Sequence, residues 1–456
     1  MDEWTRATLG ELAAPGRSVI SGPFGSNIGT KFFKSEGVPV IRGNNLTTDH
    51  RKFVDDGFVF VTEDKAEDLD TYAVENDLLF TAAGTIGQVG MIPNGARFER
   101  YVISNKQIRF RADANKIDLN YLYAWLSSPW TFKSITNRDT GSTVPLINLS
   151  VVRSLAVSFP KDVGIQREIG DIFRTLDAKI DLNNRINAEL EAMAKTIYDY
   201  WFVQFDFPDA DGRPYRSNGG AMVWNDTLKR EIPTGWSALP LLAWIARKKN
   251  GEWGAGSASD DNDAQAICIR GADIDALNGR GELRAPTRYI PPSKMEKYLA
   301  PYDLVVEISG GSPKQSTGRA ALVGPEVIER FDVPLVCSNF CKALTLKDAS
   351  HSYLFLQQWN ALYNAGVFFG WEGKTSGIKN LQFDSFVSHY HAPEPPDALS
   401  RRFHELCCSL DQRKQNGLNE NRELTRLRDW LLPLLMNGQV RVGRNGVRLT
   451  SLRCRS

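Results

Sequence analysis

The chain has 456 residues, of which 42% are hydrophobic and 24% are charged. This composition is that of a folded globular protein and excludes a disordered chain, and the length predicts about three domains. The formal net charge of +1 excludes a protein that is basic throughout, so any surface for nucleic acid must come from the arrangement of its basic residues.

The N-terminal segment lacks a basic stretch followed by an apolar one, and no run of about 18 apolar residues occurs that could span a membrane. The cysteines are sparse, lie in the second half and do not form a disulfide framework. They are Cys268, Cys337, Cys341, Cys407, Cys408 and Cys454. We therefore expect a cytoplasmic protein without membrane partners.

Residues 1–160 are predicted to form a first globular unit of mixed α and β structure. Short runs of β-branched or aromatic residues at 38–41, 77–80 and 107–110 are bounded by Gly, Asn and Pro, as strands are. Residues 121–125 are expected to form a short helix. These elements predict a globular domain.

Residues 161–205 are predicted to form one long helix. Its apolar residues recur at alternating steps of three and four, which is the seam of a coiled coil. They are Ile165, Ile169, Ile172, Leu176, Ile186, Leu190, Met193, Ile197 and Tyr200. The middle of the seam is polar, with Lys179 and Asn183. At a rise of about 1.5 Å per residue, the part of the helix that carries the seam, residues 165–202, is roughly 57 Å long, somewhat over one and a half turns of B-form DNA.

Residues 206–235 are rich in turn formers, such as those at 208–212 and 217–220. We expect them to connect the long helix to the next unit without contributing a core element.

Residues 206–396, which begin with this connection, are predicted to form a second globular unit that repeats the first. Landmarks recur in the same order at offsets between 226 and 234 residues. They are Trp4 and Trp236, Ile41-Arg42-Gly43 and Ile269-Arg270-Gly271, Asp77-Leu78 and Asp303-Leu304, Ser104-Asn105 and Ser338-Asn339, Tyr121-Leu122 and Tyr353-Leu354, Asn148-Leu149 and Asn380-Leu381, and Leu176-Asp177 and Leu410-Asp411. A repeat of this period indicates two similar units that diverged between their landmarks.

Residues 397–438 repeat the long helix and its seam. The apolar positions are Leu399, Phe403, Leu406, Leu410, Leu424, Leu427, Leu431 and Leu434, and the polar middle is Arg413, Gly417 and Glu420. Because long apolar stripes bury each other, the two helices are predicted to pair antiparallel, with the units at opposite ends. The expected core of this pair is Ile169, Ile172, Leu176, Leu190, Ile197, Phe403, Leu406, Leu410, Leu424 and Leu431.

The polar middle has two interpretations. Lys179, Asn183 and Arg413 set the register where the helices cross, as polar seam residues do, or they face solvent at a kink near Gly417. Beyond the helix, residues 439–456 are basic and are expected to form a flexible or weakly ordered tail.

Catalytic motifs of DNA-modifying enzymes are incomplete in this chain. The Pro-Pro pairs at 291–292 and 395–396 lack the flanks of an amino-methyltransferase loop. Gly373-Lys374-Thr375 ends like a phosphate-binding loop, but Phe368 occupies the place of its first glycine. Asp303 and Glu307 come nearest to a nuclease site, but Ser309 stands where the lysine belongs, and the repeat favours a turn role for Asp303.

A zinc site built from Cys337, Cys341, His389 and His391 is the remaining candidate for metal binding. Structural zinc sites present tighter pairs of ligands. We therefore expect Cys337 and Cys341 to be small residues of the core.

Polar, glycine-rich loops occupy matching places in both units. They carry side chains of the kinds that contact phosphates and read base edges. The candidate DNA-binding residues are Ser26, Asn27, Lys31, Arg42, Asn44, Asn45, Arg138, Thr140 and Ser142 in the first unit, and Lys248, Lys249, Arg270, Lys314, Gln315, Ser316, Arg319, Lys374, Ser376 and Lys379 in the second. Arg42 and Arg270 share a framework motif, so a role in supporting a loop is the alternative for them.

The chain resembles the specificity subunit of type I restriction-modification systems over nearly its whole length. The resemblance rests on the duplication, the two long helices, Gly-Pro-Phe-Gly-Ser at 22–26 and Ile-Arg-Gly-Asn-Asn at 41–45. The connecting stretch from Phe205-Asp206-Phe207-Pro208 through 222–225 to 232–236 is similar to that of one branch of the family.

The resemblance implies an α+β fold with two target-recognition domains joined by two antiparallel coiled-coil helices and related by pseudo-twofold symmetry. Each domain would bind one half of a bipartite double-stranded DNA target. The helices would set the spacing and dock two methyltransferase (M) subunits, and motor-nuclease (R) subunits would join the assembled complex. No cofactor is expected in this chain, since S-adenosylmethionine, ATP and Mg²⁺ would belong to the partners.

Two alternatives remain at this point. The chain is a stand-alone DNA-modifying enzyme whose site is not recognised, or a coiled-coil scaffold that binds protein only. Activity of the isolated chain would favour the first, and failure of the assembled complex to protect any DNA would favour the second.

Overall fold

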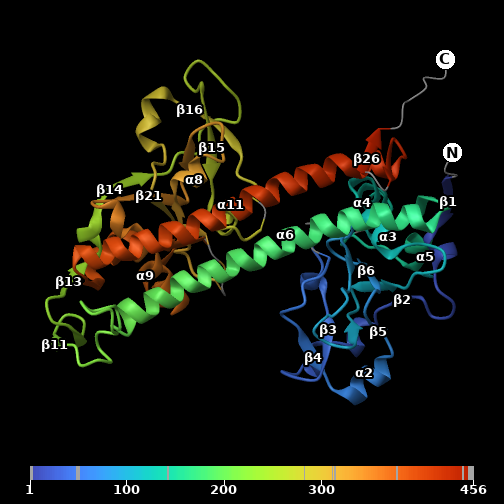
Figure 1. Ribbon diagram of the computed structural model, residues 1–456, viewed down its shortest axis with the longest axis horizontal. Helices are drawn as coiled ribbons and strands as arrows, with labels where there is room; N and C mark the ends of the chain where they lie inside the picture. The colour runs from blue at the N-terminus through green and yellow to red at the C-terminus, as the bar shows by residue number, and fades with distance from the viewer. Residues whose placement is uncertain are drawn as a thin grey trace. The chain divides into compact units, whose positions relative to one another are not determined.

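The computed structural model describes residues 4–47, 52–140, 143–281, 283–310, 312, 315–375, 378–443 and 446–449. These residues form two compact units. Unit 1 contains the described residues up to Leu182 and those from Asn421 onward, and unit 2 contains Asn183–Glu420. The two long helices, α6 (Val163–Tyr198) and α11 (Asp397–Met436), each contribute one part to unit 1 and the other part to unit 2 (Figure 1).

Unit 1 begins with short strands and helices that precede α6. They are β1 (Trp4–Thr8), α1 (Leu9–Leu12), β2 (Val19–Ser21), β3 (Val38–Ile41), β4 (Val59–Val61), α2 (Glu63–Leu69), β5 (Tyr72–Ala73), β6 (Leu78–Thr81), β7 (Val89–Met91), β8 (Tyr101–Ile103), β9 (Gln107–Phe110), α3 (Leu119–Leu126), α4 (Pro129–Thr136), α5 (Leu149–Arg153) and β10 (Ala156–Pro160). The strand orders are β2-β9-β6-β7 and β4-β3-β8-β5, and β1 pairs with β10.

Unit 2 follows the same plan between α6 and α11. Its elements are β11 (Met222–Asn225), β12 (Arg230–Pro233), β13 (Ser237–Pro240), β14 (Ile245–Asn250), β15 (Ala264–Ile269), α7 (Ile274–Leu277), β16 (Thr287–Ile290), β17 (Asp303–Glu307), β18 (Ser309–Gly310), β19 (Ala320–Val323), α8 (Pro325–Ile328), β20 (Leu335–Cys337), β21 (Cys341–Leu346), α9 (Ser352–Asn364), β22 (Glu372–Thr375), β23 (Ile378–Leu381), α10 (Phe383–His389) and β24 (His391–Glu394).

The sheets confirm that the chain is a duplication. The order β14-β21-β17-β19 in unit 2 repeats β2-β9-β6-β7 in unit 1, and the pair β13 and β24 repeats β1 and β10. The order β16-β15-β20 repeats β4-β3-β8, with one antiparallel and one parallel contact in each case. Two mixed α and β units with two long helices is therefore the observed fold class, as the sequence predicted.

The long helices run antiparallel where they contact each other. In unit 2, Asn183 donates to Glu420 at 2.8 Å, and Lys414 lies 3.4 Å from Glu191. In unit 1, Arg428 lies 3.3 Å from Asp177. Residue numbers rise along α6 as those of their partners fall along α11, which is the pattern of an antiparallel pair.

The buried stripe of each long helix is displaced by about one residue from the predicted seam at several positions. On α6, Phe173 and Asn187 are buried, whereas Ile186 is 46% exposed. On α11, Cys407 is buried, and Leu406, which was predicted in the core, is 40% exposed. The other predicted core residues are buried or partly buried: Ile169, Ile172, Leu176, Leu190, Ile197, Phe403, Leu410, Leu424 and Leu431. Each helix carries two adjacent apolar stripes, and packing against the core of its unit decides which one is buried.

The polar middle of the helices is a close contact and not a kink. Helix α11 continues through Gly417, and a Cβ atom added there would lie 2.8 Å from Oδ1 of Asn187. The bond from Asn183 to Glu420 lies beside it. Arg413, which was predicted to help set the register, is exposed. The bond of Asn183 across the helices fits the interpretation that polar residues of the seam set the register.

Two segments are more ordered than expected. The stretch 206–235, predicted as a plain connection, contains the hairpin of β11 and β12, and Ile232 is fully buried with Phe205 in the core of unit 2. In the predicted tail, β25 (Val440–Gly443) pairs with β26 (Gly446–Leu449). Residues 450–456 lie outside the described residues. In the part of the chain that the structure describes, no helix has the length and apolar character needed to cross a membrane.

Candidate nucleic-acid interface

Three loops of unit 1 meet at one edge of a sheet. Loop A1 (residues 22–27) follows β2, loop B1 (residues 42–45) follows β3, and loop C1 (residues 104–106) joins β8 to β9. Because β3 and β8 are parallel, loops B1 and C1 leave the sheet at the same edge. The amide of Ser104 donates to the carbonyl of Ile41 at 3.0 Å, and the amide of Gly22 donates to that of Gln107 at 2.9 Å.

Unit 2 builds the same cluster from loops A2 (residues 251–254), B2 (residues 270–273) and C2 (residues 338–340). The amide of Ser338 donates to the carbonyl of Ile269 at 2.8 Å, as its counterpart does in unit 1. A Cβ atom on Gly251 would lie 1.9 Å from the carbonyl oxygen of Ser338, and one on Gly22 would lie 1.8 Å from that of Ser104. Only glycine allows this approach of two backbones.

This match reveals a landmark that sequence reasoning missed. Loop A1 reads Gly22-Pro23-Phe24-Gly25, and loop A2 reads Gly251-Glu252-Trp253-Gly254. The shared pattern is glycine, any residue, an aromatic residue and glycine. With only two glycines and a changed aromatic residue, it is too short to be distinguished from chance without the structure.

Loops B1 and B2, called the arginine loops because they begin with Arg42 and Arg270, are held by the same internal hydrogen bond in both units. The amide of Arg42 donates to Oδ1 of Asn45 at 2.9 Å, and that of Arg270 donates to Oδ2 of Asp273 at 3.0 Å. Asn45 is fully buried, and its Nδ2 donates to the carbonyls of Val54 and Asp56. Its place in the structure is therefore that of a loop support and not of a DNA contact.

The guanidinium of Arg270 is also engaged within its own unit. It lies 2.7 Å from Asp273 and donates to the carbonyl of Arg284 at 2.8 Å, and the bond to Asp273 raises the pKa of Arg270. Arg42 is half-buried, with its guanidinium 6.0 Å from the ring centre of Phe33. The contacts of the Arg270 guanidinium fit the supporting role that the shared motif left open, whereas for Arg42 the contact within its unit is the Phe33 ring.

Buried carboxylates hold the turn that precedes the central strand of each unit. Asp77 accepts from the amide of Val74 at 2.9 Å, and Asp303 accepts from that of Ala300 at 2.8 Å. Asp303 also lies 2.7 Å from Nζ of Lys249, which is itself buried. The nearest approach to a nuclease site is thus a structural ion pair, and Lys249, a candidate DNA contact, is part of it.

A second pair of equivalent contacts joins the central strands to the arginine loops. In unit 1, Thr81 donates to Gln88, whose amide donates to the carbonyl of Leu46 at 3.1 Å. In unit 2, Arg319 lies 2.9 Å from Glu307 and 2.8 Å from Asp275. These two carboxylates raise the pKa of Arg319. Arg319 therefore replaces Gln88 as a connector and is not a free cation.

The candidates further along each unit are mostly bonded within the unit. Arg138 donates to Ser154 at 3.0 Å, and Thr140 donates to the carbonyl of Leu146 at 3.0 Å. Lys379 lies 3.1 Å from Glu372, and Lys248 lies 2.5 Å from Asp384. Ser316 is buried. Lys374 lies in strand β22, so Gly373-Lys374-Thr375 is not a phosphate-binding loop.

The candidates that remain exposed are Ser26, Asn27, Lys31, Asn44, Thr140 and Gln315, together with the partly exposed Lys248. Ser142, Lys314 and Ser376 lie outside the described residues. The exposed candidates are therefore concentrated on and beside loops A1 and B1.

The proposed zinc ligands are not assembled in the described part of the chain. Cys337 and Cys341 are buried in β20 and β21, and burial raises the pKa of the Cys337 thiol to about 12. His389 and His391 contact backbone carbonyls near β24. Among the described residues, no group of three or more His, Cys, Asp or Glu side chains is placed to hold a metal ion.

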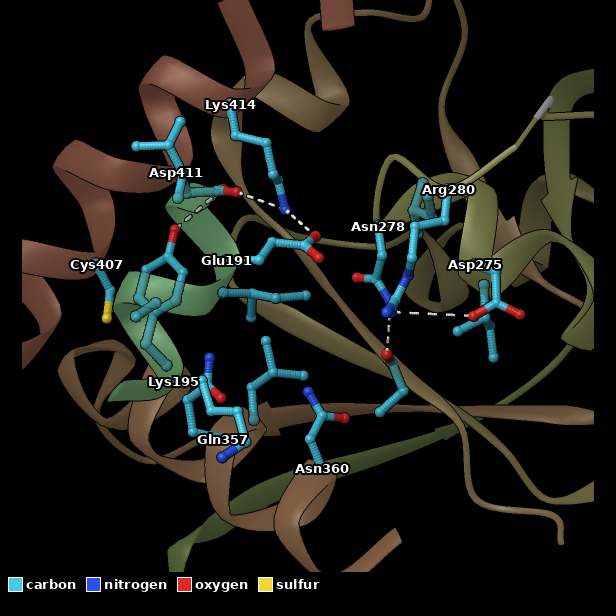
Figure 2. Close-up of a pocket in the computed structure, with 18 of the residues that line it drawn as sticks. Glu191, Lys195, Asp275, Asn278, Arg280, Gln357, Asn360, Cys407, Asp411 and Lys414 are labelled. Carbon is cyan, nitrogen blue, oxygen red and sulfur yellow. Dashed lines mark hydrogen bonds and ion pairs between the residues drawn. The ribbon is translucent and has the colours of Figure 1, made fainter. Parts of the chain in front are cut away.

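Unit 2 contains a cavity of about 440 Å³ lined in part by α6, α7, α9 and α11, and Figure 2 shows side chains that line it. Lys414 lies 3.1 Å from Asp411, which accepts from the hydroxyl of Tyr353 at 3.1 Å. Ala194 also lines the cavity, and its equivalent in the repeat is Arg428, which is buried in unit 1. The cavity marks a place where the two units pack differently against the helices.

Comparison with known proteins shows that the chain is similar to members of one family. Residues 1–192 match the model of the type I restriction modification DNA specificity domain. The type I restriction enzyme HindI specificity subunit of Haemophilus influenzae is 38% identical over 111 residues, which is 24% of each chain. The MjaIX specificity subunit of Methanocaldococcus jannaschii is 21% identical over 371 residues, covering 80% of this chain and 78% of that one.

The fold has a counterpart among solved structures. The type I restriction-modification S subunit from M. genitalium aligns with a TM-score of 0.53 and 15% identity, covering 95% of this chain and 96% of that chain. At this level of identity the likeness shows a shared fold.

Proposed function

We propose that the chain is a DNA specificity subunit of the type I restriction-modification family, to which the comparisons show similarity, and that it selects the DNA sequence on which such a complex acts. The observation that carries this proposal is the loop cluster that is built twice on one framework. Each unit binds one half of a bipartite double-stranded DNA target, and no step of the chemistry belongs to this chain.

The side chains on the two clusters support two different half-sites. Loop A1 and its surroundings expose Ser26, Asn27 and Lys31, which are types that contact phosphates and base edges. The equivalent loop A2 carries Ala255 and Gly256 just beyond its second glycine. The framework bonds are shared while the exposed groups differ, so one scaffold reads two sequences.

The long helices offer surfaces for partner subunits. Ile186 and Met193 are 46% and 51% exposed on the unit 2 part of α6, and Tyr200, in the π-helical turn that follows α6, is 40% exposed. Leu427 and Trp430 are 43% and 60% exposed on the unit 1 part of α11, and Leu427 is the repeat equivalent of Met193. Exposed apolar patches of this kind mark protein interaction sites. We propose that each patch docks one methyltransferase (M) subunit and that the helices set the spacing of the half-sites.

The partners then supply the chemistry. The M subunits would bind S-adenosylmethionine and methylate adenine at N6 after flipping it from the duplex. The motor-nuclease (R) subunits would use ATP and Mg²⁺ and join through the assembled complex.

Mapping N6-methyladenine in a host that expresses the chain with its M subunits tests the proposal. We expect methylation confined to one bipartite motif. Methylation by the isolated chain would identify a stand-alone enzyme. An assembled complex that neither methylates nor protects any sequence would identify a protein-only scaffold.

A further inference from the structure

The aromatic residues of loops A1 and A2 occupy equivalent positions. Phe24 lies two residues after Gly22, and Trp253 lies two residues after Gly251. Both glycines pack on the carbonyl of the serine that opens the neighbouring loop C1 or C2. The two rings are therefore held by the same framework. Apart from the aromatic position, loops A1 and A2 share only their glycines.

Both rings are exposed to solvent. Phe24 is 84% exposed, which is the largest exposure among the large apolar side chains that the structure describes, and Trp253 is 37% exposed. The backbone under Phe24 is fixed, because its carbonyl accepts from the amide of Asn27 at 2.8 Å. One face of Trp253 is covered by the guanidinium of Arg288, 4.0 Å from the ring centre. An exposed phenylalanine gains nothing from folding, so its position needs another reason.

Loops C1 and C2 each carry an exposed asparagine. Asn105 and Asn339 are equivalent residues on loops C1 and C2, and both are exposed. A Cβ atom on Gly25 would lie 3.1 Å from Nδ2 of Asn105, so this amide adjoins the residue that follows Phe24. A ring beside an amide combines stacking or apolar contact with hydrogen bonding to a base edge.

Cations lie on or near these loops. Lys31 follows loop A1, Lys106 is exposed on loop C1, and Arg288 stacks on Trp253. Positive charge beside an exposed aromatic ring and an amide matches a nucleic acid better than an apolar protein surface.

We propose that Phe24 and Trp253 are the residues through which each unit makes apolar contact with a nucleobase of its half-site, with Asn105 and Asn339 bonding beside them. This inference rests on the proposed function, since it assigns the residues that perform it. It adds residues that the loop candidates did not include, and it places the two half-site contacts at equivalent points of the repeat.

The test uses the complex of the full chain with its M subunits and a pool of DNA duplexes whose central region is randomised. The wild-type complex should enrich two separated sequence blocks. Phe24→Ala should weaken the enrichment of one block and leave the other intact, and Trp253→Ala should do the reverse. On the enriched sequence each variant should bind about tenfold more weakly, which is the effect of removing one ring from a base.

The salt dependence separates a ring contact from a charge contact. Phe24→Ala should leave the slope of log affinity against log salt concentration unchanged, because a ring contact releases no counterions. Lys31→Ala, which removes a charge that can meet a phosphate, should make this slope shallower by about one. Phe24→Trp and Trp253→Phe should retain binding because they keep a ring. Trp224→Ala is the matched control, since Trp224 is 57% exposed on β11, outside the loop cluster.

Three outcomes would overturn the inference. Enrichment of both blocks that is unchanged in both alanine variants would show that the rings do not touch bases. Weaker assembly with the M subunits, with normal DNA affinity once assembled, would assign the rings to a protein contact. A wild-type complex that enriches no sequence would remove the proposed function and the inference together.

Discussion

Asp77 and Asp303 hold the same turn with different cations. Asp303 is paired with the buried Lys249, which lies in β14. Asp77 lies 2.7 Å from Arg111, which directly follows β9. The connector positions differ in the same way, with a Thr81–Gln88 pair in unit 1 and Glu307–Arg319 in unit 2. At the residue scale the repeat preserves the place of a contact while its chemistry changes.

The pair of Asp303 and Lys249 gives a stability prediction. Asp303→Ala removes one partner of a buried ion pair and leaves the Lys249 ammonium without its charge partner. We expect a loss of about 3–5 kcal/mol in the unfolding free energy of unit 2. Urea unfolding measures it, with Asp68→Ala as the control, because the exposed Asp68–Lys65 pair contributes at most about 1 kcal/mol. Equal losses for the two variants would contradict the structural role.

Asp177 makes the stability of unit 1 depend on pH. Burial raises the pKa of Asp177 to about 6, although Arg428 and Lys52 act in the opposite direction. The folded state therefore holds this proton more tightly than the unfolded state does. The contribution of the protonated Asp177 to the unfolding free energy of unit 1 is fully present below about pH 4. It falls by roughly 3 kcal/mol as the pH rises to about 6.

Unfolding of the wild type and of Asp177→Asn across this range checks the prediction. The asparagine cannot titrate, so the variant should lack this part of the fall in stability between about pH 4 and pH 6. Identical pH profiles for the two proteins would assign the dependence to other groups.

At the scale of the elements, helices α6 and α11 pack closely where Gly417 lies against Asn187. Replacing a glycine inside a helix with alanine ordinarily stabilises it by about 1 kcal/mol. At Gly417 the added methyl would lie 2.8 Å from the Asn187 side chain, so we expect Gly417→Ala to destabilise unit 2 by about 1–3 kcal/mol. Thermal unfolding measures the change. The double variant with Asn187→Ala should recover most of the loss, and no recovery would show that the clash is not its cause.

The paired helices predict how the spacing of the half-sites is set. Deleting one heptad from α6 together with the facing heptad of α11 shortens the pair by about 10 Å, or about three base pairs. Under the proposed function, the methylated motif should keep both half-sites and lose about three base pairs between them. Mapping of methylated adenines in the variant measures the number of base pairs between the half-sites. The control replaces seven exposed residues of the helices with other polar residues and leaves the helix lengths unchanged. An unchanged spacing would refute the role of the helices as a ruler.

At the scale of the whole molecule, sequence reasoning succeeded where the signal is local or repeated. Strands at 38–41 and 107–110 were placed exactly, since β-branched runs bounded by turn formers depend only on neighbouring residues. The duplication and the two long helices were equally readable, because each is a pattern of spacing along the chain.

The tertiary structure decided which of the side chains in those patterns are exposed and which are buried or paired within the unit. Lys249, Arg270 and Arg319 look like free cations on flexible loops until the fold brings Asp303, Asp273 and Glu307 against them. Leu406 fits the seam, yet packing buries Cys407 in its place.

The sequence by itself therefore determined the repeated framework, since hydrophobic periodicity and turn residues act over a few positions. Only the tertiary structure decided the pairing of charges, the choice of the buried helix face and the meeting of Gly22 with Ser104 and Gly251 with Ser338. These depend on contacts between residues far apart in the chain, where burial and ion pairing are satisfied jointly and leave no local signal.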